Sequence, residues 1–158
     1  LGLQTIHERT ARYIRRGYDL PVFETAVSEL CRRGIDVIVH TILCLPGETK
    51  TDMLQTIQYL NRQDIQGIKL QLLHILKDTD LAEIYASDPF PVPDPQEYYE
   101  LLGACISHLR PDIVIHRLTG DGPKELLTAP LWTCNKRQVL NQLQSYFKTH
   151  DIWQGKEY

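Results

Sequence analysis

The sequence lacks several features that would assign a protein to a class at once. Its 158 residues contain no apolar run long enough to span a bilayer and no export signal at the start, so we expect a cytoplasmic location. Basic residues are not in excess either. The 17 Lys and Arg against 20 Asp and Glu give a net charge of -3, which excludes a general attraction to nucleic acids or anionic membranes.

Clustered cysteines are missing as well. The chain has only Cys31, Cys44, Cys105 and Cys134, and no two of them form a CxxC or CxxxCxxC pattern, so no zinc knuckle or iron–sulfur loop is encoded. The motifs GxxxxGK[ST], GxGxxG, GxSxG and HExxH are also absent. Because the chain opens on an apolar "LGLQT" without an initiator Met, we expect it to be a piece of a longer protein.

The residues that are present indicate an α/β domain. The composition, 42% hydrophobic and 23% charged, is that of a globular chain with a core. Strand-like runs alternate with segments of helical periodicity, which predicts right-handed βαβ units and a parallel sheet. Four strands cannot close an eight-stranded barrel, so the sheet is either open and doubly wound or an arc of a larger barrel. Strands are predicted at 1–5, 36–43, 67–76 and 113–118, and helices at 6–17, 19–34, 49–63, 79–87, 94–109 and 136–148.

Polar residues interrupt the predicted strands near their C-terminal ends, the edge at which parallel sheets bind ligands. His40 breaks the apolar run "DVIVHTIL" and is either a core histidine bonded to a carbonyl or a site residue. Lys69 and Gln71 share one face of the next strand, where a lysine is costly unless that face borders a wet or occupied cavity. His74 either begins a solvated loop or belongs to the same site.

The segment "HRLTGDGPK" places several polar and charged residues at the end of the last predicted strand. It contributes His116, Arg117 and Asp121 beside two glycines, whose backbone can approach a ligand closely. The Asp-Gly-Pro within it is also a common turn signal. The segment is therefore either a binding loop or an ordinary turn.

Three stretches carry a resemblance to a known family. "LGLQT" and "HTILCLPGET" with its following helix resemble the second half of a radical S-adenosylmethionine (radical SAM) core. The tail "HLRPDIVIHRLTGDGPKELLTAPLW" is similar to the uncharacterised YhcC/YtqA-like radical SAM family, which is related to the Elongator catalytic subunit and to oxygen-independent coproporphyrinogen oxidase. The resemblance implies a partial (β/α) barrel, with residues 1–88 as the C-terminal half of the core and 89–158 as an extension packed on the same sheet.

The resemblance also implies cofactors. In this superfamily a 4Fe-4S cluster reductively cleaves S-adenosylmethionine, and the resulting 5′-deoxyadenosyl radical abstracts hydrogen from a substrate. The partners implied are S-adenosylmethionine, a reductant such as flavodoxin or ferredoxin, and an unknown substrate, either RNA or a small molecule. The CxxxCxxC loop is expected upstream of Leu1, so this chain alone is expected to hold no cluster and to be inactive.

Individual residues follow from the same resemblance. Gln4 matches a strand-end Gln, and Arg16, twelve residues later, matches an Arg; in the coproporphyrinogen enzyme both positions contact S-adenosylmethionine. His40 aligns with a polar position that binds the nucleoside, and the main chain near Ile75 aligns with an adenine-contacting segment. Cys44 stands where relatives usually have Gly, whose absent side chain leaves space. The candidates for the substrate side are Lys69, Gln71, His116, Arg117 and Asp121.

Two other functions remain open from the sequence. The arginines between Arg9 and Arg16 are either a solvated helix face or the contact surface of a non-catalytic module that binds tRNA or another RNA. A metal hydrolase using His40, His74 and His116 is the third reading, although no carboxylate lies at ligand spacing beside these histidines.

Overall fold

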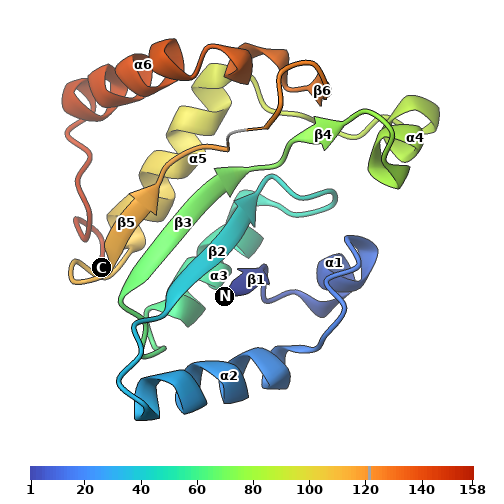
Figure 1. Cartoon of the computed structure of the whole chain (residues 1–158). Helices are drawn as coiled ribbons and strands as arrows, with labels where there is room; N and C mark the ends of the chain where they lie inside the picture. The colour runs from blue at the N-terminus through green and yellow to red at the C-terminus, as the bar shows by residue number, and fades with distance from the viewer. Residues whose placement is uncertain (121) are drawn as a thin grey trace.

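The computed structural model describes residues 1–120 and 122–158, so the predicted site residue Asp121 lies outside the described residues. Within them, four parallel strands form one sheet in the order β1-β2-β3-β5 (Figure 1). This confirms the predicted α/β fold with a parallel sheet. The strands are β1 (Gly2–Gln4), β2 (Ile38–Leu43), β3 (Gly67–Leu72) and β5 (Val114–Arg117).

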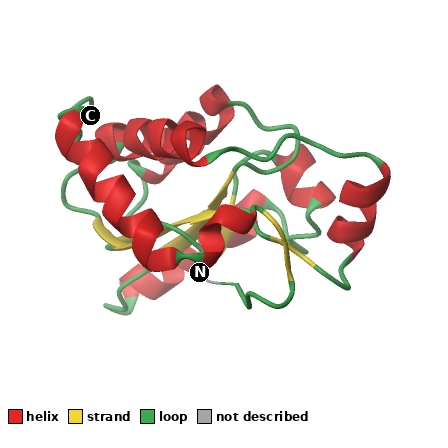
Figure 2. Cartoon of the chain, turned by 90° about the horizontal axis from the view of Figure 1, so that it is seen from above, coloured by secondary structure: helices red, strands yellow, loops and turns green. Residues whose placement is uncertain are grey.

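Helices connect the strands and cover one face of the sheet. In Figure 1, α3 and α5 pass behind β2 and β3, and no described helix crosses in front of these two strands. Figure 2 shows the strands in the middle of the molecule with helices around them. No described helix is long and apolar enough to cross a bilayer. The helices are α1 (Glu8–Tyr13), α2 (Leu20–Arg32), α3 (Lys50–Leu60), α4 (Asp80–Ser87), α5 (Pro95–His108) and α6 (Lys136–Thr149).

Local sequence signals set where the helices begin. Thr49 and Asp52 form a reciprocal capping box at the start of α3, as their spacing predicts, and Asp94 with Glu97 forms another at α5. Asp19 occupies the N-cap of α2, at the start of the predicted helix 19–34, but its side chain makes no capping hydrogen bond.

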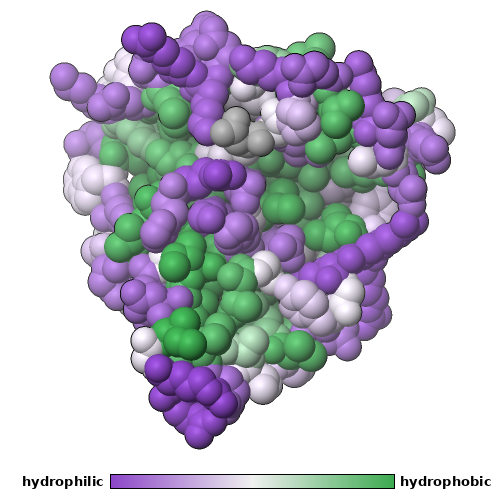
Figure 3. Space-filling view, in the orientation of Figure 1, coloured by the Kyte–Doolittle hydropathy of each residue, from purple (hydrophilic) through white to green (hydrophobic). Residues whose placement is uncertain are grey.

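The two faces of the sheet differ in burial because side chains alternate along a strand. In β2, Val39, Thr41 and Leu43 are buried, and the alternate residues are only partly covered. Figure 3 looks onto this second side, where hydrophilic groups gather over the middle of the sheet next to a hydrophobic field. We call it the open face. It carries Ile38, His40 and Ile42 from β2 and Gly67, Lys69 and Gln71 from β3.

The predicted strand 67–76 is wrong in one respect, because the structure divides it. β3 ends at Leu72, and a two-residue strand β4 (Ile75–Leu76) pairs antiparallel with β6 (Leu127–Ala129). β6 and the 3₁₀ turn after it, Leu131–Cys134, lie in a segment predicted to be a loop. A continuous apolar run does not show where a chain bends, and the partner of β4 lies about fifty residues away.

Candidate functional site

A cavity of about 720 Å³ lies at the C-terminal ends of the first three strands. Gln4, Ile42 and Leu73 mark those strand ends, and Leu45 follows β2. This is the edge at which parallel sheets bind ligands, and the volume suits a cofactor-sized molecule. The remaining wall comes from the segment after β1 and from the start of α4, through Tyr13, Ile14, Arg15, Arg16, Tyr18, Thr79, Asp80, Leu81 and Ile84.

Gln4 is held in an unusual conformation in this wall. Its backbone φ is +60°, a left-handed value that costs a residue with a side chain about 1–2 kcal/mol. The side-chain amide folds back over Gly2, so that a methyl group at Gly2 would overlap its Nε2 atom. Its Oε1 atom is buried and has no hydrogen-bond partner among the described residues. A strained residue with an unused buried acceptor is typical of a ligand-binding position.

Arg16 holds the end of β1 together. Its side chain is only 1% exposed. The guanidinium donates hydrogen bonds to the carbonyls of Leu3 and Thr5 at 3.3 and 2.9 Å, and to Glu8 Oε1 at 2.7 Å. Its Nε donates to the carbonyl of Tyr18 at 2.8 Å. Arg16 borders the cavity, and hydrogen bonds to described residues use four of the five N–H donors of its guanidinium.

The carboxylate that pairs with Arg16 is fixed from two sides. Glu8 Oε1 also accepts a hydrogen bond from the amide of Leu20, at 2.8 Å. Partial burial of Glu8 acts to raise its pKa, but the hydrogen bonds from Leu20 and Arg16 outweigh burial and lower the pKa below its usual value. Glu8 is therefore ionised at neutral pH and ties α1 to the beginning of α2.

The other arginines of the predicted patch do not share one surface role. Helix α1 ends at Tyr13, earlier than predicted, so Arg15 lies outside it with φ of +55°. Arg15 forms an ion pair with Asp80, the first residue of α4, across the cavity wall. Arg9 and Arg12 are exposed.

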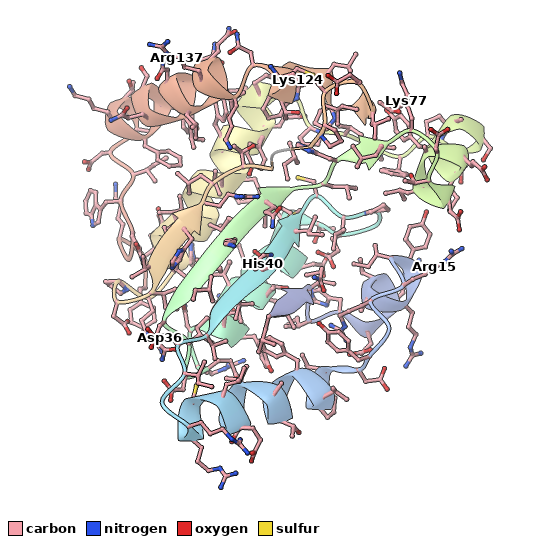
Figure 4. All side chains as sticks on the ribbon, in the orientation of Figure 1. Arg15, Asp36, His40, Lys77, Lys124 and Arg137 are labelled. Atoms are coloured by element: carbon pink, nitrogen blue, oxygen red, sulfur yellow. The ribbon has the colours of Figure 1, made fainter. Side chains whose placement is uncertain are left out.

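His40 lies on the open face, over the middle of the sheet, whereas Asp36 lies at the N-terminal end of β2 (Figure 4). Its Nδ1 atom is 3.5 Å from the amide nitrogen of Gln71. Burial lowers the pKa of His40, and the positive charges of Lys69 and Arg117 lower it further. The imidazole is therefore neutral at neutral pH. His40 does not line the cavity at the strand ends.

A β-bulge brings both His116 and Arg117 toward the open face. Gly67 pairs with Val114, but Lys69 pairs with Arg117, so the register shifts by one residue between these pairs. The ring of His116 lies over Gly67, where a Cβ would come within 2.7 Å of it. With regular alternation, only one of the two neighbouring residues of β5 could face this side.

The remaining predicted positions lie elsewhere. Ile75 is fully buried, and its main chain pairs with Ala129 of β6. The ring of His74 packs against Gly120 and Gly122. In the part of the chain that the structure describes, no three His, Cys, Asp or Glu side chains are placed to hold a metal ion. The structure therefore does not support a metal site made of His40, His74 and His116.

The loop in "HTILCLPGET" holds position 44, where the resemblance leads us to expect glycine, in a conformation that favours glycine. Cys44 has φ of +63°, a conformation that favours glycine, so backbone geometry adds to the predicted lack of space. Burial raises the pKa of its thiol to about 12, which leaves it unreactive. Glu48 in the same loop has a buried Oε1 without a partner among the described residues, and burial raises its pKa despite hydrogen bonds from Thr5 and Thr10.

Sequence reasoning missed the side of the cavity formed by α4. Asp80 and Ile84 lie on a short helix that the sequence predicts correctly, but none of its residues is among the predicted site residues. The available signal is the position of this helix directly after the predicted strand 67–76, at the edge where parallel sheets bind ligands.

Two family profiles match this chain. The Radical SAM superfamily profile matches residues 1–60, and that of the Radical_SAM C-terminal domain matches residues 65–149. The uncharacterised protein YtqA of Bacillus subtilis (strain 168) is 37% identical over 156 residues, which cover 99% of this chain and 48% of YtqA. The protein YhcC of Escherichia coli (strain K12) is 32% identical over 152 residues, 96% of this chain and 49% of YhcC.

A solved structure shares the fold. The Elp3 protein of the archaeon Methanocaldococcus infernus, with an N-terminal deletion, superposes with a TM-score of 0.83 at 16% identity, over 98% of this chain and 36% of the Elp3 chain. The chain spans about half the length of the curated relatives it matches. On these profile matches, the chain belongs to the radical SAM superfamily and carries its Radical_SAM C-terminal domain.

Proposed function

We propose that this chain is part of a longer radical SAM enzyme, in which it forms one wall of the S-adenosylmethionine site and the adjoining substrate side. The observation that carries the proposal is Gln4, whose strained backbone and unpartnered buried oxygen lie in the wall of a cofactor-sized cavity. Membership of the superfamily and the coverage of about half of each relative support it. Residues 1–88 would supply the core and residues 89–158 the extension.

The residues at the strand ends fit S-adenosylmethionine. The cofactor carries an amino group and ribose hydroxyls, which are donors for the free Gln4 Oε1 atom. Arg16 would act by keeping the carbonyls of β1 in place, since four of its five N–H donors bond to described residues. His40 does not line this cavity, so a contact of its ring with the nucleoside is not part of the proposal. The main chain near Ile75 would border the adenine.

The described residues do not fit a 4Fe-4S cluster. All four cysteines are free thiols, and no group of three potential ligands occurs among the described residues. Three thiolates close together are needed to hold such a cluster with one open iron. We therefore assign to this chain the binding of S-adenosylmethionine and substrate, and no step at the cluster.

The alternative of an RNA-binding module has less support. Its arginine patch is divided, because Arg16 is buried and Arg15 is paired with Asp80. Only Arg9 and Arg12 of the four remain exposed without an ion pair among the described residues.

The test uses the full-length protein after anaerobic reconstitution. We expect it to bind S-adenosylmethionine and to form 5′-deoxyadenosine when a reductant is added. Gln4→Ala should weaken binding about tenfold, because one hydrogen bond is worth about 1–1.5 kcal/mol. Arg9→Gln, which removes an exposed charge outside the cavity, is the matched control. A reconstituted protein that forms no 5′-deoxyadenosine, or equal affinities for the wild type and Gln4→Ala, would contradict the proposal.

A further inference from the structure

Three residues on the open face form a straight row across the sheet. His40 of β2 pairs directly with Lys69 of β3, and Lys69 pairs directly with Arg117 of β5. Directly paired residues on neighbouring strands lie about 5 Å apart and point to the same side. The bulge in β5 completes this row, because it places Arg117 opposite Lys69. We call these three side chains the cationic row, after the charges of Lys69 and Arg117.

The positive charges of the row are not balanced within the described chain. None of the ion pairs among residues 1–120 and 122–158 includes Lys69 or Arg117. Both side chains are partly buried rather than fully solvated. Their effect reaches across the sheet, since both lower the pKa of His40. The open face thus has a local positive field in a chain whose net charge is negative.

Such a row is unfavourable without a counter-ion. Like charges placed directly opposite each other on neighbouring strands destabilise a sheet, and partial burial strengthens the repulsion. Elsewhere the chain avoids this cost: Arg16 is paired with Glu8, and Arg110 with Asp112. An anionic group bound across the row would remove the repulsion and form charge-assisted hydrogen bonds with Lys69 and Arg117.

The row is separate from the cavity at the strand ends. His40 lies two residues before Ile42 along β2, a distance of about 7 Å along a strand. Of these two residues, Ile42 lines that cavity and His40 does not. Arg117 also borders a cavity of about 620 Å³ that reaches from β5 to α6 and the C-terminal segment. That cavity also touches Ile106 of α5, so it lies at the outer edge of the sheet. The row itself is adjacent to the proposed S-adenosylmethionine site, on a face where no described helix crosses β2 and β3 in Figure 1.

We infer that the substrate carries a carboxylate or phosphate group, and that this anionic group binds across His40, Lys69 and Arg117. The inference rests on the proposed function, because it takes the open face to be the substrate side. Lys69 and Arg117 neutralise the anion. The imidazole of His40 donates a hydrogen bond to it, and Gln71 orients that ring.

The experiment titrates the full-length protein with inorganic phosphate and, separately, with acetate, followed by calorimetry at constant ionic strength in chloride. We expect saturable binding of at least one anion. Lys69→Met and Arg117→Met should each weaken it tenfold or more, whereas Arg9→Met, which removes one exposed charge, should change it less than twofold. Binding of phosphate alone would identify a phosphoryl group, and binding of acetate alone a carboxylate.

Thermal unfolding without added anion shows whether a variant loses binding because it is destabilised. Lys69→Met should melt at the same temperature as the wild type or higher, because the substitution removes a repulsion. A melting temperature lower by several degrees would show that Lys69 has a structural partner and would overturn the inference. It would also be overturned if neither anion binds, or if both variants bind as well as the wild type.

The two proposals fail separately. A wild-type protein that forms 5′-deoxyadenosine but binds neither anion contradicts only the anionic substrate. A protein that binds an anion at the row but forms no 5′-deoxyadenosine contradicts only the proposed function.

Discussion

The end of β1 and the middle of the sheet use the same kinds of side chain in opposite ways. At the end of β1, the guanidinium of Arg16 is 1% exposed and bonded to two strand carbonyls and Glu8. In the cationic row, Lys69 and Arg117 stand opposite each other with no ion-pair partner among the described residues. The comparison teaches that a positive side chain near a site reports on a ligand only when the protein leaves its charge unpaired.

The largest expected effect tests the structural role of Arg16 in this comparison. Arg16→Met should reduce the free energy of unfolding of the full-length protein by about 2–4 kcal/mol, since it leaves two carbonyls and the Glu8 carboxylate without their donor. Denaturant unfolding measures the change. Arg9→Met should cost less than about 0.5 kcal/mol. If Arg16→Met also reduced the free energy of unfolding by less than about 0.5 kcal/mol, Arg16 would be free to hold a ligand instead.

The next effect concerns the packing that positions β5. Gly67→Ala should cost about 1–3 kcal/mol, because its new Cβ would overlap the ring of His116. The double variant Gly67→Ala, His116→Ala should recover most of that loss, since the overlap is gone. Unfolding free energies of the two single variants and the double variant give the coupling. Additive losses would show that the ring does not rest on Gly67.

Gln4 should respond with opposite signs in stability and binding. Gln4→Gly relieves the left-handed backbone and should stabilise the full-length protein by about 1 kcal/mol. The same variant should weaken S-adenosylmethionine binding about tenfold, because the amide is lost. Cys44→Gly changes a residue of similar φ that does not line this cavity, and should leave the affinity unchanged. A Gln4→Gly protein with wild-type affinity would argue against Gln4 as a binding residue.

The smallest effect is a pH dependence centred on His40. Its pKa in the folded protein lies below the ordinary value of 6.5, so the folded state binds fewer protons than the unfolded state as the pH falls below 6.5. The free energy of unfolding should therefore decrease from about pH 7.5 to about pH 5.5, and His40→Gln should lose this part of the decrease.

The variant Lys69→Met tests whether the charge of Lys69 lowers the pKa of His40. Removing its charge should raise the pKa of His40 toward the ordinary value, which NMR titration of the imidazole measures. Lys124→Met, at an exposed lysine outside the row, is the control. An unchanged His40 pKa in Lys69→Met would show that the row is not electrostatically coupled.

The fold was largely predictable because its signals are local. Alternating periodicities gave the strand and helix order, and the capping box of Thr49 and Asp52 set the start of α3. The bend after Leu72 was missed, because β4 is defined by its pairing with β6 and not by its own residues. Long-range pairing of this kind leaves no mark in a short window of sequence.

The sequence names candidate site residues but does not give their arrangement. Gln4, Arg16 and His40 were identified by motif resemblance, but their roles depend on contacts. The burial of the Arg16 side chain follows only from three-dimensional packing, as does the bulge that aligns Arg117 with Lys69. The sequence predicted that Lys69 needs a wet or occupied cavity, and the row explains what kind of occupant would suit it.

The most direct test of the account asks whether the two regions bind separate ligands. Phosphate or acetate, whichever binds the free protein, is titrated into full-length protein saturated with S-adenosylmethionine. We predict an anion affinity within about twofold of that of the free protein, because the cavity and the row lie at different levels of the sheet. Loss of anion binding when S-adenosylmethionine is bound would contradict the account, since it would place the carboxylate of the cofactor itself on the cationic row.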